Sequence, residues 1–149
     1  MATLPDILAA YDWGHHPEGL LFVETDRDAH RTSGHWLYHD GAASVFHRVL
    51  NSDELWFVHA GRLLLHVLEP GGGLHTLRLG TDLSNGERPR HVVPRGLWQA
   101  AELPPGEPWA FGTCVCAPPF TFERSFEIAD TATLTAGWPE HEALIRRLT

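Results

Sequence analysis

A histidine and a glutamate, His47 and Glu54, are the residues whose types and spacing most clearly suggest chemistry. They lie in two β-rich runs, Ala43 to Leu50 and Glu54 to Ala60, on either side of the turn residues Asn51-Ser52-Asp53. We expect the two runs to form a hairpin, because side chains on neighbouring strands can then converge. An imidazole that titrates near neutrality beside a carboxylate can serve as a general base, so the pair is a candidate catalytic site.

Strand periodicity extends this candidate site to neighbours two positions away. If His47 points inward then Val49 does too, and Trp56 shares the inward face of Glu54. His59 differs from Glu54 by an odd number of positions, so we expect it to face away, at an interface or in a structural hydrogen bond. One imidazole, one carboxylate and one indole would then share a pocket.

The elements that must position these residues are short strands separated by Gly, Pro, Asp or Asn at intervals of about eight to twelve residues. This pattern favours a sandwich or a closed barrel over alternating βα units. The clearest hairpin turn is Pro70-Gly71-Gly72-Gly73. The expected strands are Leu20–Thr25, His35–His39, Ala43–Leu50, Glu54–Ala60, Arg62–Glu69, Leu74–Gly80, His91–Val93, Gln99–Leu103 and Trp109–Ala117.

A short helix is expected at each end of the chain. Thr3 to Tyr11 has the signature of a capping box, with Asp6 three residues after Thr3. Pro139 to Leu148 has proline in its first turn, acidic residues near its start and two arginines near its end. The predicted plan is helix, barrel, helix.

Length and composition limit the classes of protein that the chain can be. Its 149 residues suit one domain, 1–149, and its hydrophobic content of 43% is enough for a sizeable core. A net charge of −8 argues against nucleic acid and membrane surfaces as partners. No apolar run reaches the roughly 18 residues of a membrane span and no secretion signal is evident, so a cytoplasmic location is expected.

Lysine and cysteine usage narrows the chemistry further. All basic side chains other than histidine are arginine, so no lysine amine can form a Schiff base. Cys114 and Cys116 are two apart in an apolar run, where strand alternation places both on one face. A bridge between them would be strained, and we interpret them as small core residues.

The segment around His47 and Glu54 resembles the first motif of the cupins, in which Gly, two His, Glu and Gly recur at fixed spacing. Gly41, His47, Glu54 and Gly61 match this motif, whereas Val49 stands where the second His belongs. The second cupin motif ends in His, and here Pro94 and Gly96 are followed by Gln99. The resemblance therefore implies a cupin site from which two of the four usual metal ligands are missing.

The same departures are typical of the DUF985 cupins, which the chain resembles from end to end. The resemblance implies an all-β fold, the double-stranded β-helix or jelly-roll barrel, with a ligand pocket in its mouth. It also implies a homodimer. The matching segments are His16–Gly19, Ser52–Glu54, His59–Gly61, Gly86–Pro89, Pro94–Gln99, Ala117–Phe122 and Phe126–Asp130.

The substitutions at the usual ligand positions argue against tight metal binding, because Val49 offers no lone pair and a glutamine carbonyl is a weak ligand. We expect no cofactor, and leave open a weakly bound divalent metal at His47 and Glu54. His47, Glu54 and Gln99 would instead form a hydrogen-bonding cluster for a small polar ligand. Trp56, Val49 and Tyr38, the one tyrosine in a probable barrel strand, are further candidate pocket residues.

Three functions fit these residues. The first is a metal-independent isomerase or epimerase that acts on a sugar-like or carbonyl compound with His47 and Glu54 as catalytic residues, as the resemblance to metal-free cupin epimerases and isomerases suggests. The second is a non-catalytic small-molecule binding protein that uses the same pocket. The third is a metal-dependent cupin dioxygenase or lyase. No second acid or base is identifiable from the sequence on the opposite wall of the pocket.

The run His15-His16-Pro17-Glu18 has the composition of a metal-ligand cluster. Adjacent residues of an extended chain point apart, so a role in a turn or a dimer contact is the favoured interpretation. The remaining histidines are interpreted as solvated or strand-surface residues.

Overall fold

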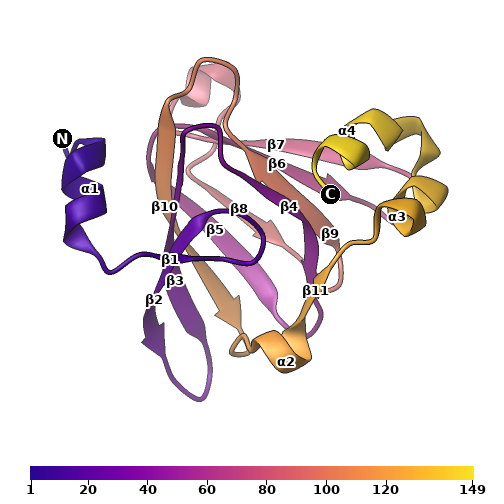
Figure 1. The fold of residues 1–149 in the computed structure, drawn as a ribbon, viewed down its shortest axis with the longest axis horizontal. Coiled ribbons are helices and arrows are strands. Elements are labelled where there is room, and N and C mark those ends of the chain that lie inside the picture. Colours follow the sequence, from indigo (N-terminus) through magenta and orange to yellow (C-terminus); the bar gives the residue numbers. More distant parts are fainter.

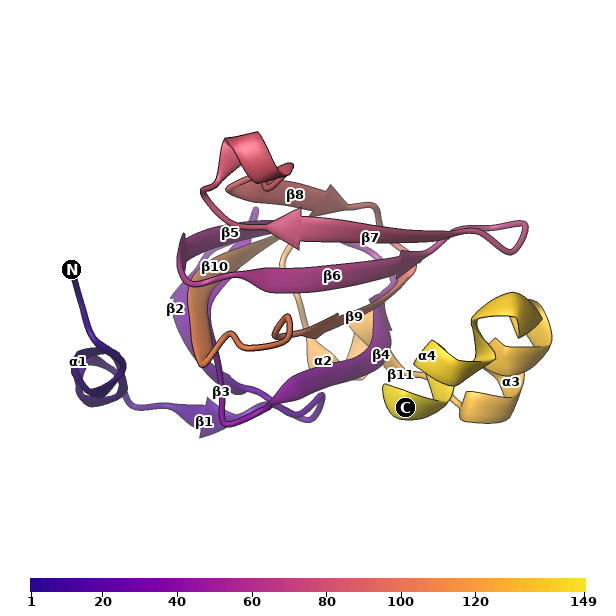
Figure 2. The ribbon, with the colours of Figure 1, turned by 90° about the horizontal axis from the view of Figure 1, so that it is seen from above.

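The computed structural model describes residues 1–149, which form two antiparallel sheets that face each other as a jelly-roll barrel (Figures 1 and 2). The six-stranded sheet has the order β1 (Gly14–His15), β2 (Leu21–Arg27), β3 (Thr32–His39), β10 (Trp109–Ala117), β5 (Asp53–Ala60) and β8 (Arg90–Val93). The five-stranded sheet has the order β11 (Phe126–Ile128), β4 (Ala43–Val49), β9 (Trp98–Glu102), β6 (Leu63–Leu68) and β7 (Leu74–Leu79).

The main core fills the space between the two sheets. Buried and more exposed residues alternate along β5, as expected for a strand with one face toward a core. Trp36 and Tyr38 of β3 lie opposite Leu63 and Leu65 of β6 in this cluster, and all four are almost fully buried. The predicted all-β jelly-roll fold is therefore confirmed.

A second, smaller core lies on the outer face of the five-stranded sheet. Phe46, Leu68 and Ala100 project from this sheet and pack against residues of two helices near the C-terminus. These helices are α3 (Thr131–Gly137) and α4 (Glu142–Arg147), joined by the 3₁₀ turn η2 (Pro139–His141), and they lie beside β4 and β11 (Figure 2). The helix predicted at Pro139 to Leu148 corresponds to η2 and α4, whereas α3 was not predicted.

The other local elements agree closely with the sequence patterns. Helix α1 (Leu4–Ala10) begins after Thr3, whose backbone N–H donates to the Asp6 carboxylate at 2.8 Å as the capping box predicts. Strands β6 and β7 pair as the predicted hairpin. A 3₁₀ turn, η1 (Leu83–Asn85), and a short helix, α2 (Phe122–Ser125), complete the chain. No helix of the structure has the length and apolar character needed to cross a membrane.

The predicted hairpin between the strands of His47 and Glu54 is wrong. Strand β4 pairs with β9 and β11, whereas β5 pairs with β10 and β8, so the two strands belong to opposite sheets. The reason is that the connecting residues hydrogen-bond elsewhere: the N–H of Leu50 donates to Ser125 O, and the Ser52 hydroxyl donates to Pro118 O. The chain therefore crosses from one sheet to the other instead of reversing within one.

Candidate functional site

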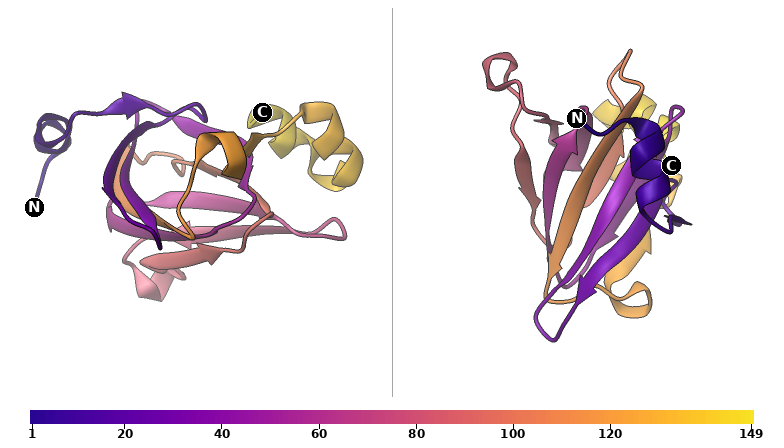
Figure 3. Two further views of the ribbon diagram at one scale, coloured as in Figure 1. Left: turned by 90° about the horizontal axis from the view of Figure 1, so that it is seen from below. Right: turned by 90° about the vertical axis from the view of Figure 1, so that its left-hand side faces the viewer.

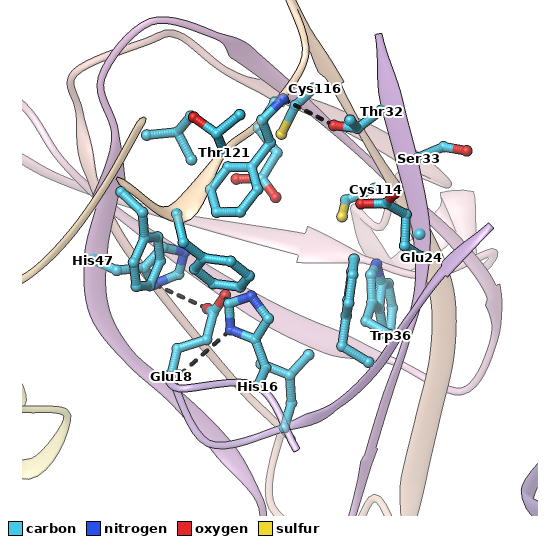
Figure 4. A pocket seen from close by; sticks show the side chains of 18 of the residues that line it. His16, Glu18, Glu24, Thr32, Ser33, Trp36, His47, Cys114, Cys116 and Thr121 are labelled. Carbon is cyan, nitrogen blue, oxygen red and sulfur yellow. Dashed lines mark hydrogen bonds and ion pairs between the residues drawn. The ribbon is translucent and has the colours of Figure 1, made fainter. Parts of the chain in front are cut away.

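A cavity of about 420 Å³ lies between the two sheets, at the end of the barrel that α2 covers (Figures 1 and 3). Six aromatic side chains line it together with several carboxylates and histidines, some of which Figure 4 shows from close by. Its volume is in the range of about 300–1,000 Å³ that is usual for small-molecule sites. The aromatic residues are Phe22, Trp36, Trp56, Phe120, Phe122 and Phe126.

The Glu18 carboxylate lies between two imidazole rings on one wall of this cavity (Figure 4). Its Oε1 is 2.9 Å from Nδ1 of His16, and its Oε2 is 3.0 Å from Nδ1 of His47. The N–H bond at Nδ1 of His47 points at Val45 O, 2.8 Å away, so Oε2 of Glu18 is not aligned with that bond and makes an ion pair instead of a well-aligned hydrogen bond. Both acceptors require that Nδ1 of His47 carries a proton.

Local backbone features bring Glu18 to His47. A bulge interrupts the pairing of β4 with β9 between Ser44 and His47, and within it the N–H of Val45 donates to Glu18 O at 2.9 Å. Gly19 allows this close approach, since a Cβ at that position would lie 2.5 Å from Ala43 O and its φ is +116°. The segment before β2 is thereby attached to β4 with its carboxylate facing inward.

Burial and charge set the protonation of this group. Burial alone would lower the pKa of His47, but the charge of Glu18, assisted by Glu54, outweighs it and raises that pKa to about 9. Burial would likewise raise the pKa of Glu18, but the charges of His47 and His16 outweigh it and lower that pKa to about 2. At neutral pH the pair is therefore imidazolium and carboxylate. Nε2 of His47 has no protein partner, and the residue lines the cavity.

Glu54 reaches the same cavity from the opposite sheet and is held by Gln99, which lies on β9 in the sheet of His47. The Trp56 indole donates to Oε1 of Gln99 at 3.1 Å, and Nε2 of Gln99 donates to Oε2 of Glu54 at 2.5 Å. The indole N–H fixes the amide orientation, because only the amide oxygen can accept from it. Burial raises the pKa of Glu54 above its ordinary 4.5; the positive charge of His47 opposes this and the negative charge of Glu18 adds to it.

The structure brings most of the residues expected from the sequence to this place. Val49 and Trp56 line the cavity with His47 and Glu54, so the predicted phase of both strands is confirmed. Gln99, expected as a pocket residue, hydrogen-bonds to Glu54 but does not itself line the cavity. Tyr38 is instead buried in the main core, where its hydroxyl donates to Ser44 at 2.8 Å and does not line the cavity.

The cysteines and His59 lie where strand alternation places them. Cys114 and Cys116 are free thiols on one face of β10, and both line the cavity. Burial raises the pKa of each thiol, which keeps them protonated at neutral pH. His59 lies on the exposed outer side of the six-stranded sheet and makes a 2.7 Å hydrogen bond with Thr113.

The sequence reasoning missed His16 and Glu18. The run His15-His16-Pro17-Glu18 was interpreted as a turn or dimer contact because adjacent residues point apart. The run does form a turn, in which the N–H of Gly19 donates to His16 O at 3.0 Å. This turn, and not the alternation of an extended strand, brings the side chains of His16 and Glu18 to the cavity. The ring of His16 is packed among Phe22, Phe122 and Phe126, with centroid separations of 5.3 to 5.6 Å.

The residues present do not fit the metal site that the cupin fold usually carries. Val49 has no donor atom, and Gln99 turns its amide N–H groups, not its oxygen, toward Glu54. No group of three or more His, Cys, Asp or Glu side chains has the arrangement needed to hold a metal ion.

A double-sheet jelly-roll barrel with a cavity between its sheets is an architecture that cupins share with other jelly-roll proteins. This chain belongs to the family described as "Cupin superfamily (DUF985)", which matches residues 5–129. No match is found among curated proteins.

Solved structures similar to the whole chain include protein SO0799 from Shewanella oneidensis, with 30% identity and a TM-score of 0.90 over 100% of this chain and 98% of that one. A hypothetical protein from Leishmania major has 24% identity and a TM-score of 0.90, with 99% of each chain covered. Oxalate decarboxylase from Bacillus subtilis has 15% identity and a TM-score of 0.64, over 93% of this chain and 37% of that one. The last two show likeness of fold alone.

Proposed function

We propose that this protein is a metal-independent isomerase that moves a proton from the carbon next to the carbonyl group of a sugar-like compound to the carbonyl carbon itself. One observation carries the proposal: a cationic histidine and a carboxyl group of raised pKa line one aromatic cavity from opposite sheets. Two titratable groups whose pKa values are displaced in one cavity are typical of acid–base sites. Here the histidine and the glutamate take different parts.

Glu54 is assigned the role of base, and His47 that of electrophile. In its ionised form Glu54 takes a proton from the carbon next to the carbonyl, and the electron pair of that C–H bond forms the enediol double bond. The Nε2–H of His47 stabilises the negative charge that develops on the carbonyl oxygen and can donate its proton to that oxygen. Glu54 then returns its proton to the neighbouring carbon, while the second hydroxyl of the enediol gives its proton back to His47.

This assignment differs from the general base expected at His47. With its pKa raised to about 9, His47 holds its proton at neutral pH and can donate it, but does not remove one from carbon. A single carboxylate that collects and returns the proton on the same face of the substrate suffices for isomerisation. Epimerisation at one carbon would need the proton to return on the opposite face, so isomerisation is the reaction that the site supports better.

Exchange of carbon-bound hydrogen with deuterated water is the test. Each sugar of a set of aldoses and ketoses is incubated with the protein, and deuterium next to the carbonyl is measured by NMR. We expect Glu54→Gln to abolish exchange, because the amide cannot accept the proton. Glu87→Gln is the matched control, since Glu87 is also a buried glutamate but does not line this cavity.

The pH dependence of exchange distinguishes the two roles. Exchange should increase as Glu54 ionises, at a pH above its ordinary 4.5, and decrease above about pH 9 as His47 loses its proton. Bound sugar without exchange would refute catalysis and leave a binding protein. Unchanged exchange in Glu54→Gln would refute the assignment of the base.

A further inference from the structure

The arginine and the two histidines of the cavity are already paired with carboxylates. The two histidines of the inner wall share one carboxylate, Glu18. The one arginine that lines the cavity, Arg27, donates from Nε and Nη2 to both carboxylate oxygens of Glu24, at 2.9 and 2.8 Å. The chain has no lysine. A phosphate or carboxylate on a ligand would therefore find no cation without a carboxylate partner.

Further carboxyl groups oppose an anionic ligand. Glu54 lies on the inner wall and Glu123 is an exposed residue that also lines the cavity. The protein as a whole carries a net charge of −8, which repels anions at long range. A buried anion without a counter-ion is costly, so these groups disfavour a charged ligand even where its shape fits.

The uncharged part of the cavity lining suits a ligand with many hydroxyl groups. Thr32 and Thr121 line the cavity with side-chain hydroxyl groups. A hydroxyl group can both donate and accept a hydrogen bond, so these side chains can pair with the hydroxyl groups of a ligand. Six aromatic rings line the cavity and offer faces against which the C–H groups of a sugar ring can pack.

We propose that the cavity selects uncharged hydroxy-carbonyl compounds, such as free sugars, over their phosphorylated or carboxylated counterparts, and that Glu24 enforces this choice by occupying Arg27. The inference rests on the proposed function for the carbonyl group of the ligand. The pairing of every cation, however, is independent of any reaction. A ligand anion at the cavity mouth would only replace one carboxylate partner of Arg27 with another, and would leave Glu24 unpaired beside it.

Binding to matched pairs of compounds tests the inference. Glucose and glucose 6-phosphate, fructose and fructose 6-phosphate, and galactose and galacturonate are each titrated against the wild-type protein by ligand-observed NMR. In at least one pair we expect the uncharged member to bind at least about tenfold more tightly. The variant Glu24→Gln frees Arg27 and should strengthen binding of the anionic member of that pair about two- to fivefold, because the Arg27–Glu24 pair is half exposed, with little effect on the uncharged member.

The control is Glu142→Gln, which removes the glutamate of an exposed Glu–Arg pair on α4 and changes the net charge equally. It should alter no affinity. The inference would be overturned if the wild-type protein bound the phosphorylated members, or a cationic analogue such as glucosamine, more tightly than the free sugars. It would also be overturned if the protein bound no compound in the set. If free sugars bind without deuterium exchange, the selectivity is upheld and the isomerase proposal is refuted. If exchange occurs only with sugar phosphates, the isomerase proposal is upheld and the selectivity is refuted.

Discussion

Replacing Glu18 with glutamine removes the charge that keeps His47 protonated and changes the side-chain shape little. Burial by itself lowers the pKa of His47, and the charge of Glu18 is the largest effect that opposes it. Without that charge we expect the pKa of His47 to fall from about 9 to below its ordinary 6.5. The ring would then be neutral at neutral pH and could no longer serve as an electrophile.

The size of the effect follows from the displaced pKa. A change from 6.5 to about 9 corresponds to about 3 kcal/mol, since each tenfold change in proton affinity is about 1.4 kcal/mol. Because the pKa is raised in the folded protein, this stabilisation is complete below pH 6.5 and is lost as the pH rises through 9. The lowered pKa of Glu18 reflects the same attraction between the two charges, so its free energy is not added to the ~3 kcal/mol. This attraction is also lost at low pH, as the pH falls from 4.5 through about 2.

Urea unfolding from below pH 6.5 to above pH 9 measures the difference in unfolding free energy between wild type and Glu18→Gln. We expect a difference of about 3 kcal/mol at the low end of this range that shrinks toward the high end. The matched control is Glu102→Gln. Glu102 pairs with the exposed Arg147 and lies 2.9 Å from Nε2 of His66, but burial lowers the pKa of that histidine, so no buried cation loses its partner.

An NMR titration of His47 provides a second measurement that global stability cannot mimic. The ring protons of His47 should titrate near pH 9 in the wild type and below 6.5 in Glu18→Gln. A wild-type histidine that titrates near 6.5, or a stability difference that does not vary with pH, would refute the reasoning. The proposed division of roles between His47 and Glu54 would fall with it.

Two further substitutions test the supports of the site. Gly19→Ala should lower the unfolding free energy by about 2 kcal/mol or more in a urea titration, because of backbone strain and because the new Cβ would lie 2.5 Å from a β4 carbonyl oxygen. In the control, Gly41→Ala, φ is also positive but nothing lies within 4 Å of the new Cβ, so a smaller loss of unfolding free energy is expected. An equal loss in the two variants would contradict this reasoning. Gln99→Leu should cost about 1–3 kcal/mol because it leaves the Trp56 N–H unpaired, and it should raise the pKa of Glu54 further, as followed by carboxyl ¹³C NMR, because the Gln99 hydrogen bond lowers it. An unaltered Glu54 titration would show that the amide has no such effect.

Much of the barrel was predictable because strand periodicity is a local property. Runs such as Trp109 to Ala117 and the hairpin around Pro70 to Gly73 are bounded by turn residues, and the structure confirms them. The inward phase of His47 with Val49, and of Glu54 with Trp56, follows from the same period of two. Which strand pairs with which is not local, because it depends on where the backbone groups of each connection find partners.

The failure at the β4–β5 connection illustrates this limit. The residues Asn51 to Asp53 have the composition of a hairpin turn, yet Ser52 donates to Pro118, which is 66 positions later in the chain. The charge of His47 was likewise not predictable, since an isolated imidazole titrates near neutrality. Its raised pKa depends on Glu18, which the sequence reasoning had assigned to a turn or dimer contact.

The loss of metal-binding character at the second motif also depends on more than one substitution. A glutamine at position 99 carries a carbonyl oxygen that could face a cation and an amide group that cannot. Trp56, 43 positions earlier, decides between them, because its N–H takes the amide oxygen and so turns the nitrogen toward Glu54. The amide then stabilises the ionised form of Glu54, which the proposed reaction requires. A substitution that weakens a metal site thus also supports an acid–base one, and Trp56 is as responsible for this as Gln99.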